Sequence, residues 1–360
     1  MNKILVINTV PTERNGITGV IFNYLNAIER GGLRMDLLSL NEPNSVYIKQ
    51  VEERGGKVYV LPRRGNRIFR YWNGLRILVS ENHYDIVHVH GNSHTIVLEL
   101  TAIKAAGGAK CIVHAHSTSC SHMLLHHLLS PIFSVLCDYG LACGAKAGYF
   151  MFGKSRFVII NNGVDVERYR FNPMNRKKTR NLLNITEGEC LLGHVGYFQD
   201  IKNQRFIVEI MRHLDSQFKL VLIGDGPQRK EVKERVIEYG LSDRVIFTGS
   251  ITNVESYLSA IDLIIMPSLF EGVPLTLIEQ QASGLNCVVS DTITREADKT
   301  GNVTFVPLSD GPEKWASIIK KMPVETERTK ISEEAIGRIE TTGYSIQREA
   351  NKLLDFYHSI

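Results

Sequence analysis

The chain has 360 residues, of which 43% are hydrophobic and 22% are charged. This length exceeds one ordinary core and suits two domains, and the composition excludes both a disordered and a membrane-spanning protein. The net charge of +4 is uneven, since residues 1–165 carry 17 Lys and Arg against 11 Asp and Glu, whereas 166–360 carry 25 against 27. The basic excess of the first half is modest, and no segment resembles a nucleic-acid recognition module, so we expect no nucleic-acid partner.

The N-terminal sequence predicts a cytoplasmic protein. Met1-Asn2-Lys3 leads directly into the short run ILVINTV, without the long apolar region of a signal peptide. The longest stretch without Asp, Glu, Lys or Arg, 111–137, holds five histidines and a proline and is a poor transmembrane candidate. The six cysteines show no CxxC spacing, so we expect reduced thiols.

In the first half, strand-like apolar runs alternate with helical patterns. The expected strands are 3–10, 35–40, 57–62, 84–90, 109–117, 139–144 and 157–163, and the expected helices are 19–30, 45–55, 72–82, 95–107 and a long stretch after 117. Nearly continuous apolar strands with intervening amphipathic helices predict a parallel sheet covered on both faces. The fold class is therefore α/β.

The same alternation restarts after 161–173, which has the turn signals and proline of a linker. The expected strands are 189–198, 218–226, 244–250, 262–268, 285–291 and 303–308. We predict two Rossmann-like domains, 1–165 and 166–340, followed by a C-terminal helical segment, 341–360, that packs back on the first domain.

Two carboxylates follow the expected strand 262–268. In FEGVPLTLIEQQASG, at 270–284, Glu271 and Glu279 are separated by seven residues around a turn and the start of a helix. Ligands of open α/β sheets bind beyond the carboxyl ends of the strands, which places Glu271 there. Pro274 suits the first turn of a helix, and the free N–H groups that follow attract an anion such as a diphosphate. Glu279 then accepts hydrogen bonds from hydroxyls such as those of ribose.

PSLFEGVPLTLIEQQASGLNCVVSD closely resembles the E-x7-E signature of retaining glycosyltransferases of family 4, which have the two-domain GT-B fold. NGITGVIFNYLNAI, YDIVHVHG, NNGVDVERY and GDGPQRKEVKERVIEYGLSDRVIFTG are similar to further segments of that family, so the resemblance covers nearly the whole chain. The chain looks closest to members that build capsular or exopolysaccharide repeat units.

The resemblance implies roles for individual residues. Glu271 would contact hydroxyls of the donor sugar, Glu279 the nucleotide ribose, and Lys202 the diphosphate leaving group, where charge develops. The backbone of the turn would approach the sugar and diphosphate through Gly272, Val273, Pro274 and Leu275. In the first domain, Gly16 would let backbone approach the phosphates or the acceptor, and His116 would face the donor sugar or organise the acceptor. Ile251 would lie in the loop that frames the nucleobase.

One position departs from the family pattern. Members commonly have an arginine after the glycine as a second phosphate ligand, but here Tyr197 follows Gly196. Arg205 or a first-domain residue would then compensate, or the donor would bind more weakly.

Histidines offer little sign of a metal. His122 and His126 share a helix face without a nearby cluster of acids or cysteines, and no Asp-x-Asp motif occurs, so we expect a metal-independent enzyme without cofactor. We expect His114, two residues before His116, to be a core residue on the opposite face of its strand.

These features predict retaining transfer of a sugar, such as a hexosyl group, from a nucleotide diphosphate sugar to a saccharide or polyprenyl-linked acceptor. Family resemblance favours UDP, and front-face attack fits better than double displacement. A non-catalytic nucleotide-sugar-binding or scaffold subunit remains the alternative. A dinucleotide-dependent oxidoreductase is disfavoured, because G-x-G-x-x-G is absent after the first strand.

The segment 57–76 interleaves six basic residues with Phe69, Tyr71 and Trp72. Two interpretations stay open: a solvated loop and helix face, or peripheral association with the inner face of the plasma membrane through anionic headgroups.

Overall fold

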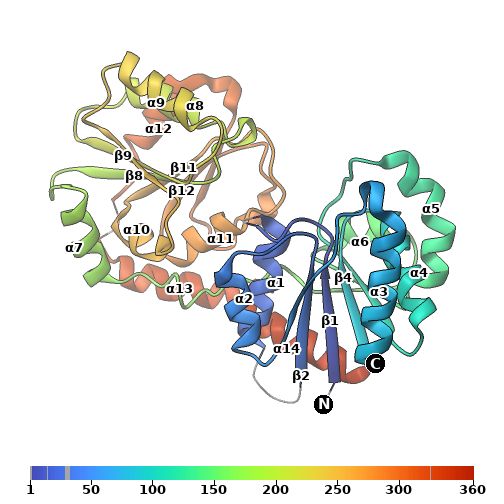
Figure 1. Ribbon diagram of the computed structural model, residues 1–360. Helices are drawn as coiled ribbons and strands as arrows, with labels where there is room; N and C mark the ends of the chain where they lie inside the picture. The colour runs from blue at the N-terminus through green and yellow to red at the C-terminus, as the bar shows by residue number, and fades with distance from the viewer. Residues whose placement is uncertain (1, 14, 29–32, 325) are drawn as a thin grey trace. The chain divides into compact units, whose positions relative to one another are not determined.

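The computed structural model describes residues 2–13, 15–28, 33–324 and 326–360 and divides into two compact units. Unit 1 comprises residues 1–163 together with 346–360, and unit 2 comprises 164–345. Figure 1 shows a twisted sheet flanked by helices in each unit. The two Rossmann-like sheets that the sequence predicts are confirmed.

Unit 1 has a seven-stranded parallel sheet in the order β3-β2-β1-β4-β5-β6-β7. Its strands are β1 (Asn2–Asn8), β2 (Leu33–Ser39), β3 (Val58–Val60), β4 (Ile86–His90), β5 (Lys110–Ala115), β6 (Tyr139–Ala142) and β7 (Phe157–Ile159). The helices are α1 (Gly16–Ala27), α2 (Ser45–Glu52), α3 (Ile68–Asn82), α4 (Val97–Ala106), α5 (Met123–Leu136), α6 (Ala145–Phe152) and α14 (Ile346–Ser359), with short 3₁₀ turns η1 (Gly65–Arg67) and η2 (His94–Ile96).

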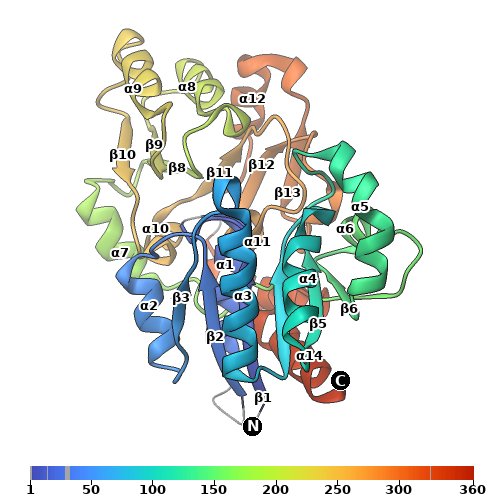
Figure 2. The same ribbon diagram turned by 45° about the vertical axis from the view of Figure 1, so that its right-hand side comes forward.

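Alternate residues of β4 serve the two faces of this sheet. Val87 and Val89 belong to a core that also holds Leu75 of α3 and Leu100 of α4. His88 points to the other face. Figure 2 shows α3 and α4 in front of the sheet and α14 behind it.

The C-terminal helix α14 belongs to unit 1, whereas residues 341–345 of the segment predicted to return belong to unit 2. The Tyr357 hydroxyl lies 2.6 Å from Nδ1 of His88, and the Glu349 carboxylate accepts a 2.7 Å hydrogen bond from the backbone of Asn161. Both side chains on α14 are buried. These contacts hold the C-terminal helix against the same unit that contains the N-terminal strand β1.

The basic segment 57–76 is less open than its sequence indicates. Tyr71 is fully buried and donates to Glu99 at 2.7 Å, and Trp72 donates to Thr101 at 3.0 Å. Of the three aromatic rings, Phe69 alone is strongly exposed, at 87%. Arg64 forms a 2.6 Å ion pair with the buried Glu99. Of the three rings, Tyr71 is thus withdrawn from the surface, and Trp72 is half-buried.

Unit 2 has a six-stranded parallel sheet in the order β10-β9-β8-β11-β12-β13. Its strands are β8 (Cys190–Val195), β9 (Phe218–Ile223), β10 (Val245–Gly249), β11 (Leu263–Met266), β12 (Asn286–Ser290) and β13 (Val303–Val306). The helices are α7 (Pro173–Leu182), α8 (Gln204–Arg212), α9 (Arg229–Glu238), α10 (Val254–Ala260), α11 (Leu275–Ala282), α12 (Gly311–Ile319) and α13 (Arg328–Thr341), with 3₁₀ turns η3 (Asp200–Lys202), η4 (Arg295–Ala297) and η5 (Leu308–Asp310). Hydrophobic cores pack on both faces of the sheet.

A buried arginine ties the C-terminal ends of two helices together. The Arg328 guanidinium donates to the carbonyls of Leu258 at 2.6 Å, of Ile261, and of Ser283 at 3.0 Å. These carbonyls terminate α10 and α11, where backbone acceptors lack intrahelical partners. Arg328 therefore holds α11 in place from the end opposite to Glu271.

Replacing this arginine tests that role. We expect Arg328→Met, which keeps the apolar stem and removes the donors, to lower the free energy of unfolding by about 2–3 kcal/mol. Denaturant unfolding in a Trp72→Phe background follows unit 2 alone, through buried Trp315. Lys330→Met, on the exposed face of α13, is the control and should change stability by less than about 0.5 kcal/mol. Equal losses in the two variants would contradict the capping role.

Candidate functional site

Two loops at the carboxyl ends of neighbouring strands carry the candidate charges of unit 2. Lys202 lies in η3, after β8, and Glu271 lies after β11. The Leu269 N–H donates to the Ile201 carbonyl at 2.8 Å, and the Asn203 side chain donates to the carbonyl of Pro267 at 3.2 Å. These bonds hold the loops side by side.

Lys202 and Glu271 form a direct ion pair. Both side chains are mostly buried, with 15% and 17% of their surfaces exposed. The Glu271 carboxylate also accepts a 3.2 Å hydrogen bond from the Ser268 hydroxyl. The structure therefore brings together two of the residues that the sequence assigns to the sugar and the diphosphate.

Close backbone packing supports the Lys202 loop. A Cβ atom at Gly224, whose φ is +135°, would lie 2.1 Å from the carbonyl oxygen of Gly196. The N–H of Gly196 donates to Ile223 at 3.0 Å, and that of Phe198 donates to Asp225 at 2.9 Å. The glycine at 224 is thus required for the loop after β8 to rest on the loop after β9.

The turn before α11 differs slightly from the sequence prediction. Pro274 is the N-cap residue, with extended backbone, and the helix begins one residue later at Leu275. No side chain caps this helix start. Val273 and Leu275 pack against hydrophobic clusters, whereas a Cβ atom at Gly272 would meet nothing within 4 Å. The helix start therefore presents uncapped N–H groups beside an open glycine.

Glu279 lies on α11 in a polar but poorly solvated position. The Tyr169 hydroxyl hydrogen-bonds its carboxyl, and Arg168 adds a favourable charge. Burial nevertheless raises the pKa of Glu279 to about 7 because it penalises the ionised form more than these partners favour it. By solvent accessibility the Glu279 side chain is half-buried, so a ligand can reach the carboxyl and donate hydrogen bonds to its charged form.

Three other unit 2 residues have different surroundings. Tyr197, which replaces the arginine of the family pattern, is 58% exposed. Ile251 packs against a hydrophobic core. Arg205 forms ion pairs with Asp200 at 2.8 Å and Glu231 at 3.1 Å, so its charge is already partly neutralised.

In unit 1, Gly16 begins α1 and is exposed, and a Cβ atom there would meet nothing within 4 Å. His116 follows β5 and is half-buried, with Nε2 2.8 Å from Nδ1 of His90. Burial lowers the pKa of His116 to about 4. The expectation that His114 lies on the opposite face of its strand is wrong, because the two rings stack with centroids 4.4 Å apart. Residues two apart on a strand share a face.

Sequence reasoning missed three polar residues of unit 2. One is Tyr169, described above. Nε2 of His194 is buried without a partner, and a Cβ at Gly196 would lie 3.1 Å from it and 3.5 Å from Lys202 Cδ. The Thr276 hydroxyl, in the first turn of α11, is also buried without a partner. Only the polarity of His194 in an apolar strand and of Thr276 after the proline signalled them in the sequence.

Two Rossmann-like units, with a lysine–glutamate pair and an uncapped helix start after adjacent strands of the second, have the architecture of the GT-B class of glycosyltransferases. Comparison with known domains supports this class over most of the chain. A Glycosyltransferase Family 4 domain matches residues 14–168, and a Glycosyl transferases group 1 domain matches residues 189–322. The chain is thus a glycosyltransferase with a family 4 domain in its first half and a group 1 domain in its second.

Individual relatives agree. The Bacillus subtilis (strain 168) protein EpsF, named as a glycosyltransferase, is 28% identical over 96% of this chain and 94% of its own. An Escherichia coli UDP-Gal:alpha-D-GlcNAc-diphosphoundecaprenol alpha-1,3-galactosyltransferase is 28% identical over 59% of each chain. The structure of Anabaena Alr3699/HepE in complex with UDP and glucose superposes with a TM-score of 0.78 over the whole of both chains, at 17% identity, and has the same fold.

The ion pair of Lys202 and Glu271 is testable by a double-mutant cycle. We expect Lys202→Met and Glu271→Gln each to destabilise unit 2, and the double variant to lose less than their sum, with a coupling of about 0.5–3 kcal/mol. Denaturant unfolding followed through Trp315 in the Trp72→Phe background gives the four free energies. Additive losses would mean that the two side chains do not interact in solution.

Proposed function

We propose that this glycosyltransferase transfers the sugar of a UDP-sugar donor to a hydroxyl of a saccharide acceptor, with retention at the anomeric carbon. In this proposal the acceptor is carried on a polyprenyl diphosphate. We propose polysaccharide biosynthesis as the setting, since the similar Staphylococcus aureus protein CapH, 28% identical over 39% of this chain, is named as a capsular polysaccharide biosynthesis glycosyltransferase. The observation that carries the proposal is the Lys202–Glu271 pair next to the uncapped start of α11, with Glu279 farther along the same helix.

The donor assignment combines chemistry with relatives. A helix start and a lysine suit a diphosphate, and a carboxylate suits ribose hydroxyls. The Anabaena structure contains UDP, and the name of the E. coli enzyme gives a UDP-sugar donor and a diphosphoundecaprenol-linked acceptor. The proposal needs no metal at the diphosphate, since Lys202 and the backbone N–H groups supply the positive charge.

The ion pair implies an exchange of partners when the donor binds. In the free protein Glu271 neutralises Lys202. A diphosphate competes for the ammonium group and leaves the Glu271 carboxylate to accept hydrogen bonds from sugar hydroxyls. The lysine then meets the negative charge that grows as the glycosidic bond breaks. One such electrostatic contact is worth about 10²–10³ in rate.

Retention is proposed to follow front-face attack. A double displacement needs a carboxylate nucleophile, but Glu271 pairs with Lys202 and accepts from Ser268, and we assign Glu279 to ribose. In the proposed step the bond from the anomeric carbon to the diphosphate oxygen breaks, and the acceptor oxygen bonds to that carbon on the same face. The departing phosphate takes the acceptor proton.

The remaining roles follow the family resemblance. We assign His116 to a hydroxyl of the donor sugar or to the acceptor, and Gly16 to a close backbone approach to phosphates or acceptor. The backbone at 272–275 is assigned to the sugar and diphosphate, and the Ile251 loop to the nucleobase. The open space at Gly16 and Gly272 supports the two glycine assignments, because no atom of the described residues lies within 4 Å of a Cβ built at either position.

A non-catalytic nucleotide-sugar-binding subunit is the second candidate, favoured by Tyr197 and by the engagement of Arg205 with two carboxylates. Both leave the diphosphate with one cation fewer than the family pattern supplies. Donor hydrolysis or transfer by the purified protein distinguishes the two.

A thermal-shift panel of UDP, GDP, ADP and their sugar conjugates tests the donor site. We expect the UDP compounds to stabilise the wild type, by about 2.7 kcal/mol at 100 times the dissociation constant. Glu279→Ala should lose this stabilisation, whereas Glu234→Ala, on the exposed face of α9, should keep it. If no nucleotide stabilises the wild type even at millimolar concentration, the donor site is wrongly assigned.

The same site should respond to pH. Because the pKa of Glu279 is raised to about 7, its ionised fraction grows as the pH rises through that value, and UDP affinity should grow with it. The free energy of unfolding of the ligand-free protein should fall as the pH rises from 4.5, the ordinary carboxyl pKa, to about 7, because the folded state keeps the proton of Glu279 over this range and the unfolded state does not. Calorimetric titration with UDP at several pH values should show that affinity changes less with pH for Glu279→Gln than for the wild type. The protonation of UDP itself affects both proteins equally, so it cancels in this comparison. Identical profiles would exclude Glu279 as the responding group.

A lipid-linked acceptor requires access to a membrane surface. Among the described residues, no helix combines the length and apolarity needed to cross a bilayer. Both α3 and α5 begin at the carboxyl edge of the unit 1 sheet, because each follows a parallel strand. Exposed apolar side chains lie near these helix starts, namely Ile68 and Phe69 on α3 and Leu124, Leu125 and Leu128 on α5. Arg63, Arg67 and Arg70 are exposed near the first group. We propose that this edge docks on the anionic inner face of the plasma membrane.

Liposome flotation tests this docking. We expect the wild type to float with anionic vesicles and the Arg63→Glu/Arg67→Glu/Arg70→Glu variant to lose most of that binding, since each basic residue near the surface contributes about 1 kcal/mol. Arg64 is left unchanged because it pairs with buried Glu99. A control with Lys177, Lys178 and Lys230 of unit 2 changed to Glu carries the same charge change. Equal flotation of both variants would exclude this surface.

A further inference from the structure

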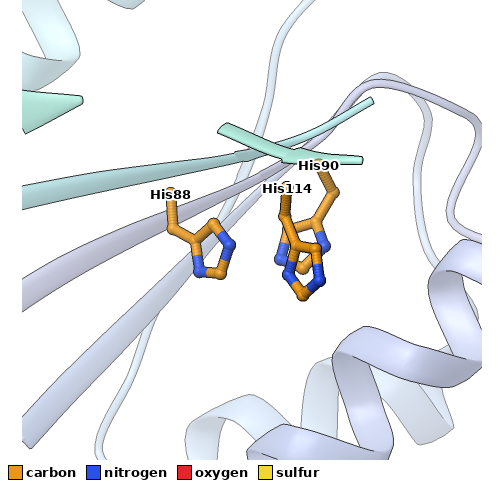
Figure 3. Close-up of side chains that lie close together, drawn as sticks. All are labelled: His88, His90 and His114. Atoms are coloured by element: carbon orange, nitrogen blue, oxygen red, sulfur yellow. The ribbon is translucent and has the colours of Figure 1, made fainter. Parts of the chain in front are cut away.

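Neighbouring strands β4 and β5 place three imidazoles on one face of the unit 1 sheet. Figure 3 shows His88 and His90 of β4 and His114 of β5 extending to the same side of the strands. His90 and His114 are register partners, and the three residues are at most 3% exposed. One nitrogen from each ring lies within 4.8 Å of the others. Three polar rings thus share a buried space.

The hydrogen bonds of the cluster leave a specific set of nitrogens free. Nδ1 of His88 lies 2.6 Å from the Tyr357 hydroxyl, and Nδ1 of His90 lies 2.8 Å from Nε2 of His116. Among the described residues, Nε2 of His88 is buried without a hydrogen-bond partner, and neither ring nitrogen of His114 has a hydrogen bond of good geometry, although the backbone of Ile160 lies close to that ring. Buried polar atoms without partners are costly and rare in folded proteins. His88 and His90 are therefore each held through Nδ1, which leaves their Nε2 atoms for another partner.

We propose that His88, His90 and His114 bind a divalent transition-metal ion, with Zn²⁺ the ion that this ligand set fits best. Neutral imidazole is a preferred ligand of zinc, copper and nickel, whereas magnesium and calcium require oxygen ligands, which this cluster lacks. The ligand atoms are Nε2 of His88 and His90 and one ring nitrogen of His114. Ligating histidines usually hydrogen-bond through their second nitrogen, as His88 does to Tyr357 and His90 does to His116.

Two properties of the site bear on binding. Burial lowers the pKa of all three histidines, so no proton has to be displaced from these rings at neutral pH. The rings are stacked, with centroids 4.3 Å apart for His88 and His90 and 5.2 Å apart for His90 and His114. Because a metal bond lies in the ring plane, common ligation turns at least one ring about its Cβ–Cγ bond.

The site lies within unit 1, and its hydrogen bond to Tyr357 reaches α14. It is joined by the His90–His116 contact to the histidine that we assign to the donor sugar or the acceptor, but its proposed role is structural. A bound ion sets the tautomer of His88, because a metal on Nε2 leaves the proton on Nδ1, which then donates to the Tyr357 oxygen. The ion is thus a structural link between β4, β5 and the C-terminal helix.

The test uses the full chain, treated with a chelator and dialysed. We expect added Zn²⁺ to raise the unfolding temperature of the wild type by several degrees, and Co²⁺ to give the visible absorption bands of a tetrahedral ion, saturating at one ion per chain. His114→Phe keeps a stacked ring of similar size and removes both nitrogens, so it should show neither effect. The His122→Gln/His127→Gln variant removes exposed histidines of the same unit and should behave as wild type.

The outcomes separate metal binding from a purely structural stack. If wild-type protein gives no Co²⁺ bands and no zinc-dependent stabilisation, the proposal is overturned, and this result does not require any variant to fold. Bands that persist in His114→Phe but vanish in the His122→Gln/His127→Gln variant would overturn it as well, and would place the ion on the surface histidines.

Discussion

Parallel pairing of the strands is the constraint on which both candidate sites depend. All strands of a parallel sheet end at one edge, so residues far apart in sequence meet wherever their strands are neighbours. β8 and β11 are adjacent, and this places the Lys202 loop beside the Glu271 loop although 69 residues separate them. β4 and β5 are adjacent too, and alternate residues of the two strands bring the imidazoles to one face.

Burial gives the charges of unit 2 their chemical character. Lys202 and Glu271 lie mostly out of water and balance each other, and Glu279 stays partly protonated near neutral pH because its surroundings solvate the anion poorly. Without a ligand, the buried charge of Glu279 lowers the stability of the folded state, and the charges of Lys202 and Glu271 neutralise each other. Such arrangements are typical of sites at which a ligand, not the fold, completes the hydrogen bonding.

The sequence was informative where local pattern decides structure. Apolar runs located the strands, and the glutamates on either side of the Gly-Val-Pro turn located the start of α11 to within one residue. Contacts between distant segments were out of reach: nothing near Glu279 in the sequence indicates that Tyr169 is its partner, and nothing near Tyr71 indicates that Glu99 draws it inward. The face of His114 was predictable from the two-residue period of a strand, and that error came from misapplying the period.

The assignment of α14 to unit 1 has a consequence for biosynthesis. Residues 346–360 complete a unit whose other residues are made first, and unit 2 lies between them in the chain. A ribosome therefore releases every residue of unit 2 before the helix that covers the unit 1 sheet. Unit 2 can fold as a continuous segment during synthesis, whereas unit 1 lacks the contact of Tyr357 with His88 until residues 346–360 have been made. A nascent chain halted before residue 346 would therefore hold a unit 1 sheet without α14.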